Sequence, residues 1–173
     1  MPVAIPDGGG VGVAIPVTLE AGCNCTVANV VIALGINHTR VSDLIMAPAS
    51  PDFDDVLLVF KPPSSANLVS SNKITFDDTP DVNTKDPRNI GNGLGTSDPI
   101  PADTYYAQGS NPNVQTQPAA PPGAYPDNEG LGKFNGKTVA GDWRFFVSDF
   151  ASGNNGTIES VDLIITCAEY LKV

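Results

Sequence analysis

Few residues in this 173-residue sequence have side chains that could carry a reaction. There is one histidine, His38, so any mechanism that needs an imidazole as general base must use it. No Gly-x-Ser-x-Gly motif, which would place a serine nucleophile on a sharp turn, occurs in the sequence. The carboxylate pairs Asp54–Asp55 and Asp77–Asp78 suit glycoside hydrolysis, but aromatic residues make up only 7% of the chain and form no stripe for sugar stacking. A hydrolase that combines His38 with a serine or with a carboxylate pair is one alternative function.

Three cysteines, Cys23, Cys25 and Cys167, allow one disulfide bond. Cys23 and Cys25 are too close in sequence to bridge each other easily, whereas Cys167 lies near the far end of the chain. Cys167 alternates in step with Leu163 and Ile165, so we expect its sulfur to face the interior. The sequence predicts a bridge from Cys167 to Cys23 or to Cys25, and the alternation does not choose between them. Three reduced cysteines are the competing interpretation.

Aspartate accounts for fifteen of the nineteen acidic residues. Four of them, Asp43, Asp77, Asp78 and Asp149, stand at or just after the ends of expected strands. If these strand ends meet at one edge of the fold, the carboxylates can bind a hard cation such as Ca²⁺, with backbone carbonyls and water completing about six to eight ligands. Ca²⁺ is the only cofactor that the sequence suggests. The competing interpretation is that each carboxylate caps a turn and accepts hydrogen bonds from backbone amides.

The overall charge excludes two classes of partner. Nine Lys and Arg against nineteen Asp and Glu give a net charge of −10, so the chain lacks the basic face that a nucleic acid or an anionic membrane surface requires. No apolar run approaches about eighteen residues, and we therefore expect no segment that inserts into a membrane. The first residues, MPVAIPD, hold no basic segment before an apolar one, so we expect no signal peptide within the sequence.

Alternating apolar residues predict short β-strands along most of the chain. From 11 to 19, Pro16 on the opposite face favours an edge strand or a bulge. Asn155–Gly156, between two alternating runs, is typical of a type I′ hairpin. No segment shows a 3.6-residue period, so we predict an all-β sandwich of about eight strands in a single domain over 1–173. The expected strands cover 11–19, 30–36, 41–46, 56–60, 73–76, 143–147 and 161–167.

The stretch 79–128 breaks this pattern, because nine prolines and five glycines fall within it. A loop of this length inside one domain is normally functional, disordered or an insertion. We interpret it as an excursion from the single domain, and we expect Ile100 and the pair Tyr105–Tyr106 to anchor it on the sandwich.

Several short motifs resemble those of a known family, in the same order along the chain. The most specific is Gly141–Asp149, with the sequence GDWRFFVSD, followed by Asn155–Ile158 with the sequence NGTI. The set resembles the P domain, also called the P/Homo B domain, which directly follows the catalytic domain in kexin- and furin-like proprotein convertases and in many bacterial secreted subtilisin-like proteases. The other pieces are Ile5–Asp7, His38–Leu44, Ala49–Pro51, Thr75–Asp78, Tyr125–Pro126 and Leu131–Gly136.

The resemblance implies a jelly-roll-like antiparallel β-sandwich without catalytic activity of its own. In convertases the P domain packs against the subtilisin-like domain and is needed for its folding and stability. The implied partner is therefore a catalytic protease domain, a serine-type endopeptidase, attached N-terminally in the same parent chain. The implied location is extracellular or at the cell surface, and some bacterial relatives bind calcium in this domain. Because a fold does not fix a function, an adhesive or carbohydrate-binding β-sandwich of a surface protein is the alternative.

Two segments depart from the family pattern. Gly153-Asn154-Asn155-Gly156 stands where bacterial members usually have Gly-Asp-x-Gly, so a metal ligand from that turn is not expected. The connection 79–128 is longer than in the family, and it is where this chain could carry a binding surface of its own.

Overall fold

The computed structural model describes residues 2–8, 12–17, 25–52, 54–60, 62, 64–79, 98–107 and 130–168. Within them lie β-strands and two short 3₁₀-helices but no α-helix, which confirms the all-β prediction. No helix among these residues is long and apolar enough to cross a membrane. The elements are β1 Val3–Ile5, β2 Gly12–Val17, β3 Val27–His38, η1 Val41–Asp43, β4 Leu44–Ala49, β5 Val59–Phe60, β6 Ile74–Asp77, β7 Thr104–Tyr105, η4 Gly130–Phe134, β8 Trp143–Asp149 and β9 Gly156–Cys167.

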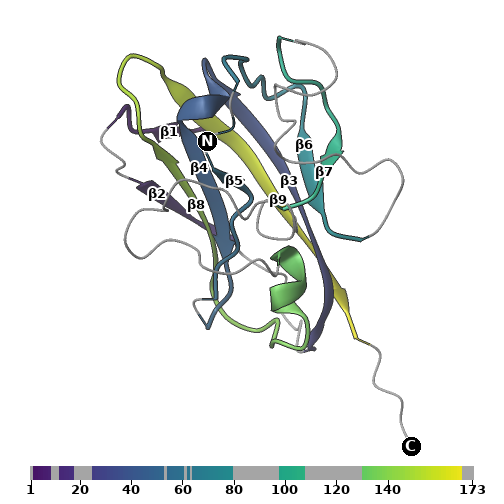
Figure 1. Ribbon diagram of the computed structural model, residues 1–173. Coiled ribbons are helices and arrows are strands. Elements are labelled where there is room, and N and C mark those ends of the chain that lie inside the picture. The colour runs from purple at the N-terminus through teal and green to yellow at the C-terminus, as the bar shows by residue number, and fades with distance from the viewer. Residues whose placement is uncertain are drawn as a thin grey trace, which may run out of the picture.

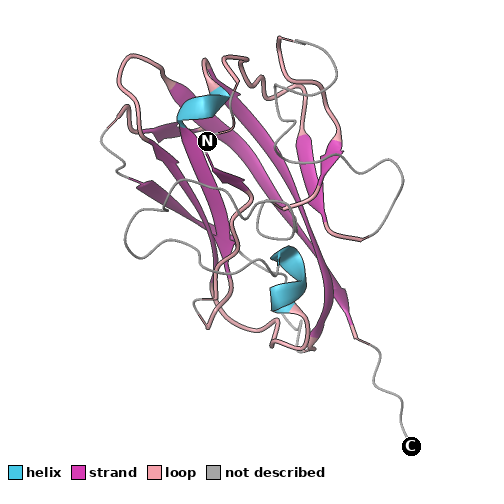
Figure 2. Cartoon of the chain, viewed as in Figure 1, coloured by secondary structure: helices cyan, strands magenta, loops and turns pink. Residues whose placement is uncertain are grey.

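The strands form two sheets that make a β-sandwich (Figures 1 and 2). One sheet has the strand order β1-β9-β3-β6-β7 and the other has the order β2-β8-β4-β5. All pairs are antiparallel except β6 and β7, which run parallel. The predicted sandwich is therefore confirmed, with one parallel pair that was not expected. β3 and β9 have twelve residues each and form the longest pair.

The core lies between the sheets and is filled by alternate residues of each strand, as the two-residue period requires. On β8, Trp143, Phe145 and Val147 are buried and the residues between them are half-buried. Trp143 packs edge-on against Phe134 of η4, with ring centroids 5.2 Å apart. The indole Nε1–H donates a hydrogen bond to the Val139 carbonyl (3.0 Å). The expected core position of Trp143 is confirmed, and its one polar atom has a partner, as burial requires.

Two expected strands are shorter in the structure, whereas the expected 30–36 and 161–167 are parts of the longer β3 and β9. The first residues of the expected strand 41–46 form η1, in which the N–H of Asp43 donates to the Arg40 carbonyl (3.3 Å), and the chain enters β4 only at Leu44. Only Val59–Phe60 of the expected strand 56–60 pairs as β5. The sequence did not predict β1 and β7, because two or three residues are too few to show alternation. Pro16 lies on β2 at a sheet edge, as expected.

β8 and β9 do not form a hairpin, because they lie in different sheets and do not pair with each other. Residues 150–155 connect the two strands, and Gly153 takes the positive φ of 93° within this connection. Gly156 is instead the first residue of β9 and pairs with His38. The type I′ prediction is therefore wrong. Glycine is needed at 156 for space, because a Cβ there would overlap the imidazole of His38.

Part of the long stretch 79–128 lies on the sandwich, as far as the described residues 98–107 show. Ile100 is fully buried, and its N–H donates to the Asn67 carbonyl (3.0 Å). Tyr105, in β7, is buried against Phe76, with ring centroids 6.3 Å apart. The expected anchoring by Ile100 and Tyr105 is confirmed, and Tyr106 is half-buried.

Candidate functional site

The single histidine lies in the interior and joins the two sheets. His38 ends β3 in one sheet and Asp149 ends β8 in the other, and neither side chain is exposed to solvent. The Nε2 of His38 lies 3.2 Å from Oδ2 of Asp149. The second carboxylate oxygen, Oδ1, accepts the N–H of Ala151 (2.9 Å). Both oxygens of this buried carboxylate are thus hydrogen-bonded, as burial of a polar group requires.

Both ring nitrogens of His38 are engaged by protein groups. Because a carboxylate can only accept hydrogen bonds, Nε2 carries a hydrogen and donates a hydrogen bond to Asp149. In the neutral ring, Nδ1 then accepts the N–H of Arg40 (3.1 Å). In the protonated ring, Nδ1–H donates to the Arg40 carbonyl, which lies 2.9 Å away. A general base needs a nitrogen within reach of the substrate proton, and this geometry leaves His38 none.

Asp43 lies at the same end of the sandwich and holds the β8–β9 connection (residues 150–155). Its side chain is buried, and Oδ2 accepts Nδ2–H of Asn154 (2.8 Å) while Oδ1 accepts the hydroxyl of Ser42 (3.2 Å). Its backbone carbonyl accepts the N–H of Phe150 (2.9 Å). Asp43 thus fixes the connection through its side chain and through its backbone.

Two further residues hold the same connection from other parts of the chain. Both carboxylate oxygens of Asp7 accept the N–H of Gly153 (2.9 and 3.2 Å). The hydroxyl of Thr39 donates to Oδ1 of Asn154 (3.1 Å), and its N–H donates to the Asn155 carbonyl (3.3 Å). Four motifs of the family resemblance therefore converge here: Ile5–Asp7, His38–Leu44, Gly141–Asp149 and Asn155–Ile158.

Asp77 and Asp78 lie elsewhere, at the end of β6. In the ladder Asp77 pairs with Val31, which is seven residues before His38 on β3. At 3.3 Å per residue these positions are about 23 Å apart along the strand. The prediction that all four carboxylates meet at one edge is therefore wrong. It assumed that every strand end followed by aspartate reaches the same end of the sandwich, whereas β6 ends near the middle of β3.

The carboxylates at the end of β6 bind backbone amides. Oδ1 of Asp78 accepts the N–H of Ala107 (2.8 Å) and Oδ2 accepts the N–H of Leu131. Oδ1 of Asp77 accepts the N–H of Thr79 (2.9 Å). Asp78 therefore ties β7 and η4 to β6, which joins two more motifs of the resemblance, Thr75–Asp78 and Leu131–Gly136.

These positions do not fit one calcium site. Within the residues that the structure describes, no group of three or more His, Cys, Asp or Glu side chains is placed to hold a metal ion. The oxygens of Asp43 and Asp149 that would face a cation already accept hydrogen bonds from protein donors. This geometry favours the competing interpretation, in which the carboxylates hold turns. The calcium prediction itself is left to a chelator experiment.

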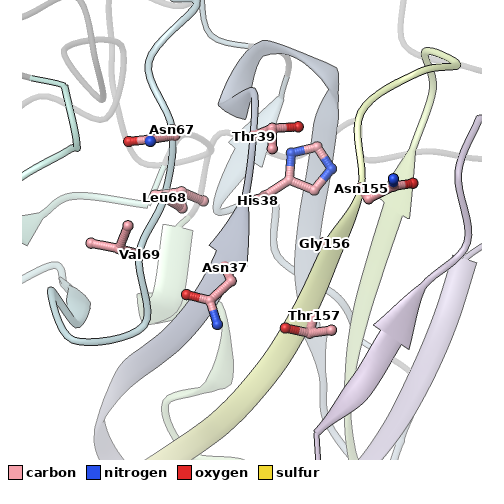
Figure 3. Close-up of a pocket in the computed structure, with 9 residues that line it drawn as sticks. All are labelled: Asn37, His38, Thr39, Asn67, Leu68, Val69, Asn155, Gly156 and Thr157. Carbon is pink, nitrogen blue, oxygen red and sulfur yellow. The ribbon is translucent and has the colours of Figure 1, made fainter.

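A shallow pocket of about 390 Å³ opens beside the buried histidine (Figure 3). The end of β3, the segment 67–69 and the start of β9 form its walls. The side chains of Asn37, Thr39 and Thr157 are hydrogen-bonded, whereas the buried Oδ1 of Asn67 has no partner. Asn37 donates to Glu159 (3.1 Å) and accepts the N–H of Ser70 (2.8 Å), and the hydroxyl of Thr157 donates to Glu159 (2.8 Å). The lining residues are Asn37, His38, Thr39, Asn67, Leu68, Val69, Asn155, Gly156 and Thr157. They include no aromatic platform for a sugar ring, and none of their hydroxyls is hydrogen-bonded to His38.

Cys25 and Cys167 form a disulfide bond, with their Cα atoms 5.8 Å apart. The bridge joins the start of β3 to the end of β9. The predicted bridge is confirmed and its partner is Cys25, whereas Cys23 lies outside the described residues. Cys167 as a whole residue is exposed, but its ladder partner is the buried Val27 and its bridge partner Cys25 packs against the core, so the inward direction of its sulfur stays a prediction. Cys167 is the last residue of β9, where solvent reaches it from the strand end.

Among the residues that the structure describes, two titratable groups have clearly shifted pKa values, and both lie away from His38. Burial raises the pKa of Tyr105 to about 12, and the charge of Asp103 adds to this effect. The hydrogen bond to Asp54 raises the pKa of Lys137, whose ammonium lies 2.6 Å from that carboxylate.

Comparison with known proteins gives structural similarity only. No protein-family model matches the sequence, and no curated protein matches it. A solved structure of the Aeromonas sobria serine protease in complex with its chaperone is similar to 98% of this chain, with a TM-score of 0.48 and 16% identity. A structure of the serine protease of Aeromonas sobria is similar to 95% of it, with a TM-score of 0.45 and 15% identity. In each case this chain covers 26% of the other protein.

Proposed function

We propose that this chain is a non-catalytic domain of the P/Homo B type, which packs on an N-terminally attached, secreted subtilisin-like protease and stabilises its folded state. The observation that carries the proposal is how the motifs of the family resemblance are used. Their residues bind one another: His38 donates to Asp149, and the N–H of Thr39 donates to the Asn155 carbonyl. Residues that bind one another in this way stabilise the fold of the domain, and a stable fold gives a partner domain a fixed surface to pack against.

The remaining motifs are used in the same way. Asp78 accepts the N–H of Leu131, which joins the Thr75–Asp78 and Leu131–Gly136 pieces. Gly141 has a φ of 126°, and a Cβ there would lie 2.6 Å from Cβ of Pro51, so the GDW and ASP pieces are in close contact. Each described piece of the pattern thus contacts another piece.

The physical basis of the proposed stabilisation is mass action. A domain that binds only the folded protease lowers the free energy of the folded state by RT ln(1 + [L]/Kd). For a tethered domain, [L] is an effective concentration on the order of 1 mM. A modest intrinsic Kd of about 1 μM would then stabilise the protease by about 4.1 kcal/mol, which is a large part of the stability of a typical domain.

The first test is the parent open reading frame, which must encode subtilisin-type Asp, His and Ser motifs upstream of this domain. The second test is expression of the catalytic region with and without the domain. We expect soluble, active protease only when the domain is present. Full activity and an unchanged melting temperature without it would overturn the proposal.

A hydrolase in its own right makes a different prediction. The purified 173-residue chain would turn over casein or an activated ester, and His38→Ala would abolish that turnover. We expect no turnover, because both nitrogens of His38 are engaged by the protein.

A further inference from the structure

β9 is paired along only part of one of its edges. β1 pairs with its first three residues, Gly156 to Ile158. Of the other nine residues, Glu159–Cys167, all but Glu159 pair with β3 on one side, and none pairs with a described strand on the other. Such an edge exposes a row of backbone N–H and C=O groups that can accept another strand.

The interior of the sandwich is incompletely covered along the same edge. The inward-facing residues of this stretch, Val161, Leu163 and Ile165, are only partly buried. Their ladder partners on β3 are Leu34, Ile32 and Val30, which are at most 1% exposed. The other sheet repeats the contrast, since Val13, Ile15 and Val17 of β2 are partly buried while their partners on β8 are buried. Solvent therefore reaches apolar side chains between β2 and the unpaired stretch of β9, which we call the open side.

The register of β1 indicates which segment of the chain would cover the open side. Val3 pairs with Ile158 and Ile5 pairs with Gly156, so the two strands are antiparallel. Moving from Val3 toward the N-terminus, the partner positions move toward Cys167. A chain that leads into β1 as a strand would therefore run beside the unpaired stretch, whose nine residues span about 30 Å.

We infer that the segment joining the upstream domain to β1 extends β1 as an added strand along Glu159–Cys167 and closes the open side. The inference rests on the proposed function, because it requires a domain upstream. Backbone hydrogen bonds to β9 would supply the pairing, and alternate apolar side chains would fill the gap beside Leu163. The outward positions suit polar residues, because the outward neighbours on β9 include Asp162, which already pairs with Lys73.

Hydrogen–deuterium exchange tests the inference on two proteins, the 173-residue chain and the intact parent protein. We expect amides within 159–167 to exchange at least about tenfold more slowly in the parent, because the edge strand becomes an internal strand there. Equal exchange in both proteins would overturn the inference. Protection that is already present in the 173-residue chain would also overturn it, since another part of the chain would then cover the edge.

Two neighbouring variants separate the open side from the outer face of the same strand. Leu163→Lys places a charge in the open side, whereas Ile164→Lys changes an outward residue that is already 55% exposed. We expect the first variant to lose the added protection in the parent and the second to keep it. Circular dichroism of both variants in the 173-residue chain checks their folding. If Leu163→Lys unfolds that chain, Leu163→Thr takes its place.

A second copy of this chain is the competing occupant. Light scattering of the 173-residue chain would then show a dimer that Leu163→Lys dissociates, and this result would overturn the inference. The proposed function fails separately. If β9 is protected in the parent but the protease folds equally well without the domain, the docking stands and the stabilising role falls. If the protease needs the domain but β9 stays unprotected, the role stands and the docking falls.

Discussion

Removing the disulfide bond is expected to destabilise this chain by several kcal/mol, on the order of 3 to 5. Cys25 and Cys167 are separated by 142 residues, so their bond closes a loop that contains most of the domain. In the chain-entropy model, a loop of this size restricts the unfolded chain by an amount worth about 5 kcal/mol at 25 °C. The same bond clamps one end of the β3–β9 pair, so that pair should fray from this end once the bond is gone.

The assay is urea denaturation of the Cys25→Ser/Cys167→Ser variant beside the wild-type protein, followed by circular dichroism. We expect the free energy of unfolding to fall by roughly 3 to 5 kcal/mol, which for a chain of this size lowers the melting temperature by on the order of 10 °C. Cys23→Ser is the matched control, because Cys23 is not part of the bridge, and it should leave stability nearly unchanged. A loss under about 1 kcal/mol in the double variant would refute the reasoning. A count other than one free thiol in the wild-type protein, in denaturant without reductant, would also refute the reasoning.

Of four further predictions, three concern single positions and the fourth concerns calcium. Asp149→Ala should lower the free energy of unfolding by about 3 kcal/mol in urea, since it leaves a buried imidazole N–H without its acceptor. Gly156→Ala should cost about 1–3 kcal/mol in the same assay because its Cβ overlaps the histidine ring, whereas Gly132→Ala, where a Cβ meets nothing, should be tolerated. The pKa of Tyr105 is raised to about 12 in the folded state, so stability should fall as the pH rises from about 10 to 12, by at most about 2.7 kcal/mol; Tyr105→Phe should remove that part of the loss in alkaline melts. The calcium prediction requires that Ca²⁺ at 100 times its Kd add about 2.7 kcal/mol; a melting temperature that chelator leaves unchanged, or a shift that survives Asp43→Ala, would remove the proposed site.

The sequence predicted the sandwich and its long strands because alternation over seven or more residues is a strong signal. Trp143, Phe145 and Val147 are core residues for that reason. The same signal failed at 41–46, where a local Arg40–Asp43 hydrogen bond replaces the first pairs. The signal was absent for β1, which pairs with residues more than 150 positions away, from Ile5 with Gly156 to Val3 with Ile158. It was also absent for β7, which is placed by its parallel contact with β6.

The site was predicted only in part. The sequence marked His38, Asp43 and Asp149 as residues of interest, and the structure brings them to one end of the sandwich. It could not show that His38 and Asp149 pair across the sheets, since 111 residues separate them. The role of Gly156 was misjudged. Asn-Gly is a common turn sequence, but here glycine is needed because it leaves space for the imidazole of His38. Asp77 and Asp78 were grouped with the wrong end because the sequence does not give the register of β6 on β3.

The order of strands in the two sheets affects how this domain would respond to a proteolytic cut, to which a domain attached to a protease would be exposed. β9 lies between β1 and β3, and β8 lies between β2 and β4, so late segments of the chain are inserted between early ones in both sheets. A single cut anywhere between Cys25 and Cys167 leaves two fragments that the disulfide still joins. When the cut lies between β4 and β8, neither fragment can leave without breaking the ladders on both sides of β8 and of β9. A nicked domain should therefore migrate as one species on a non-reducing gel, separate into two only with reductant, and keep its fold after the cut.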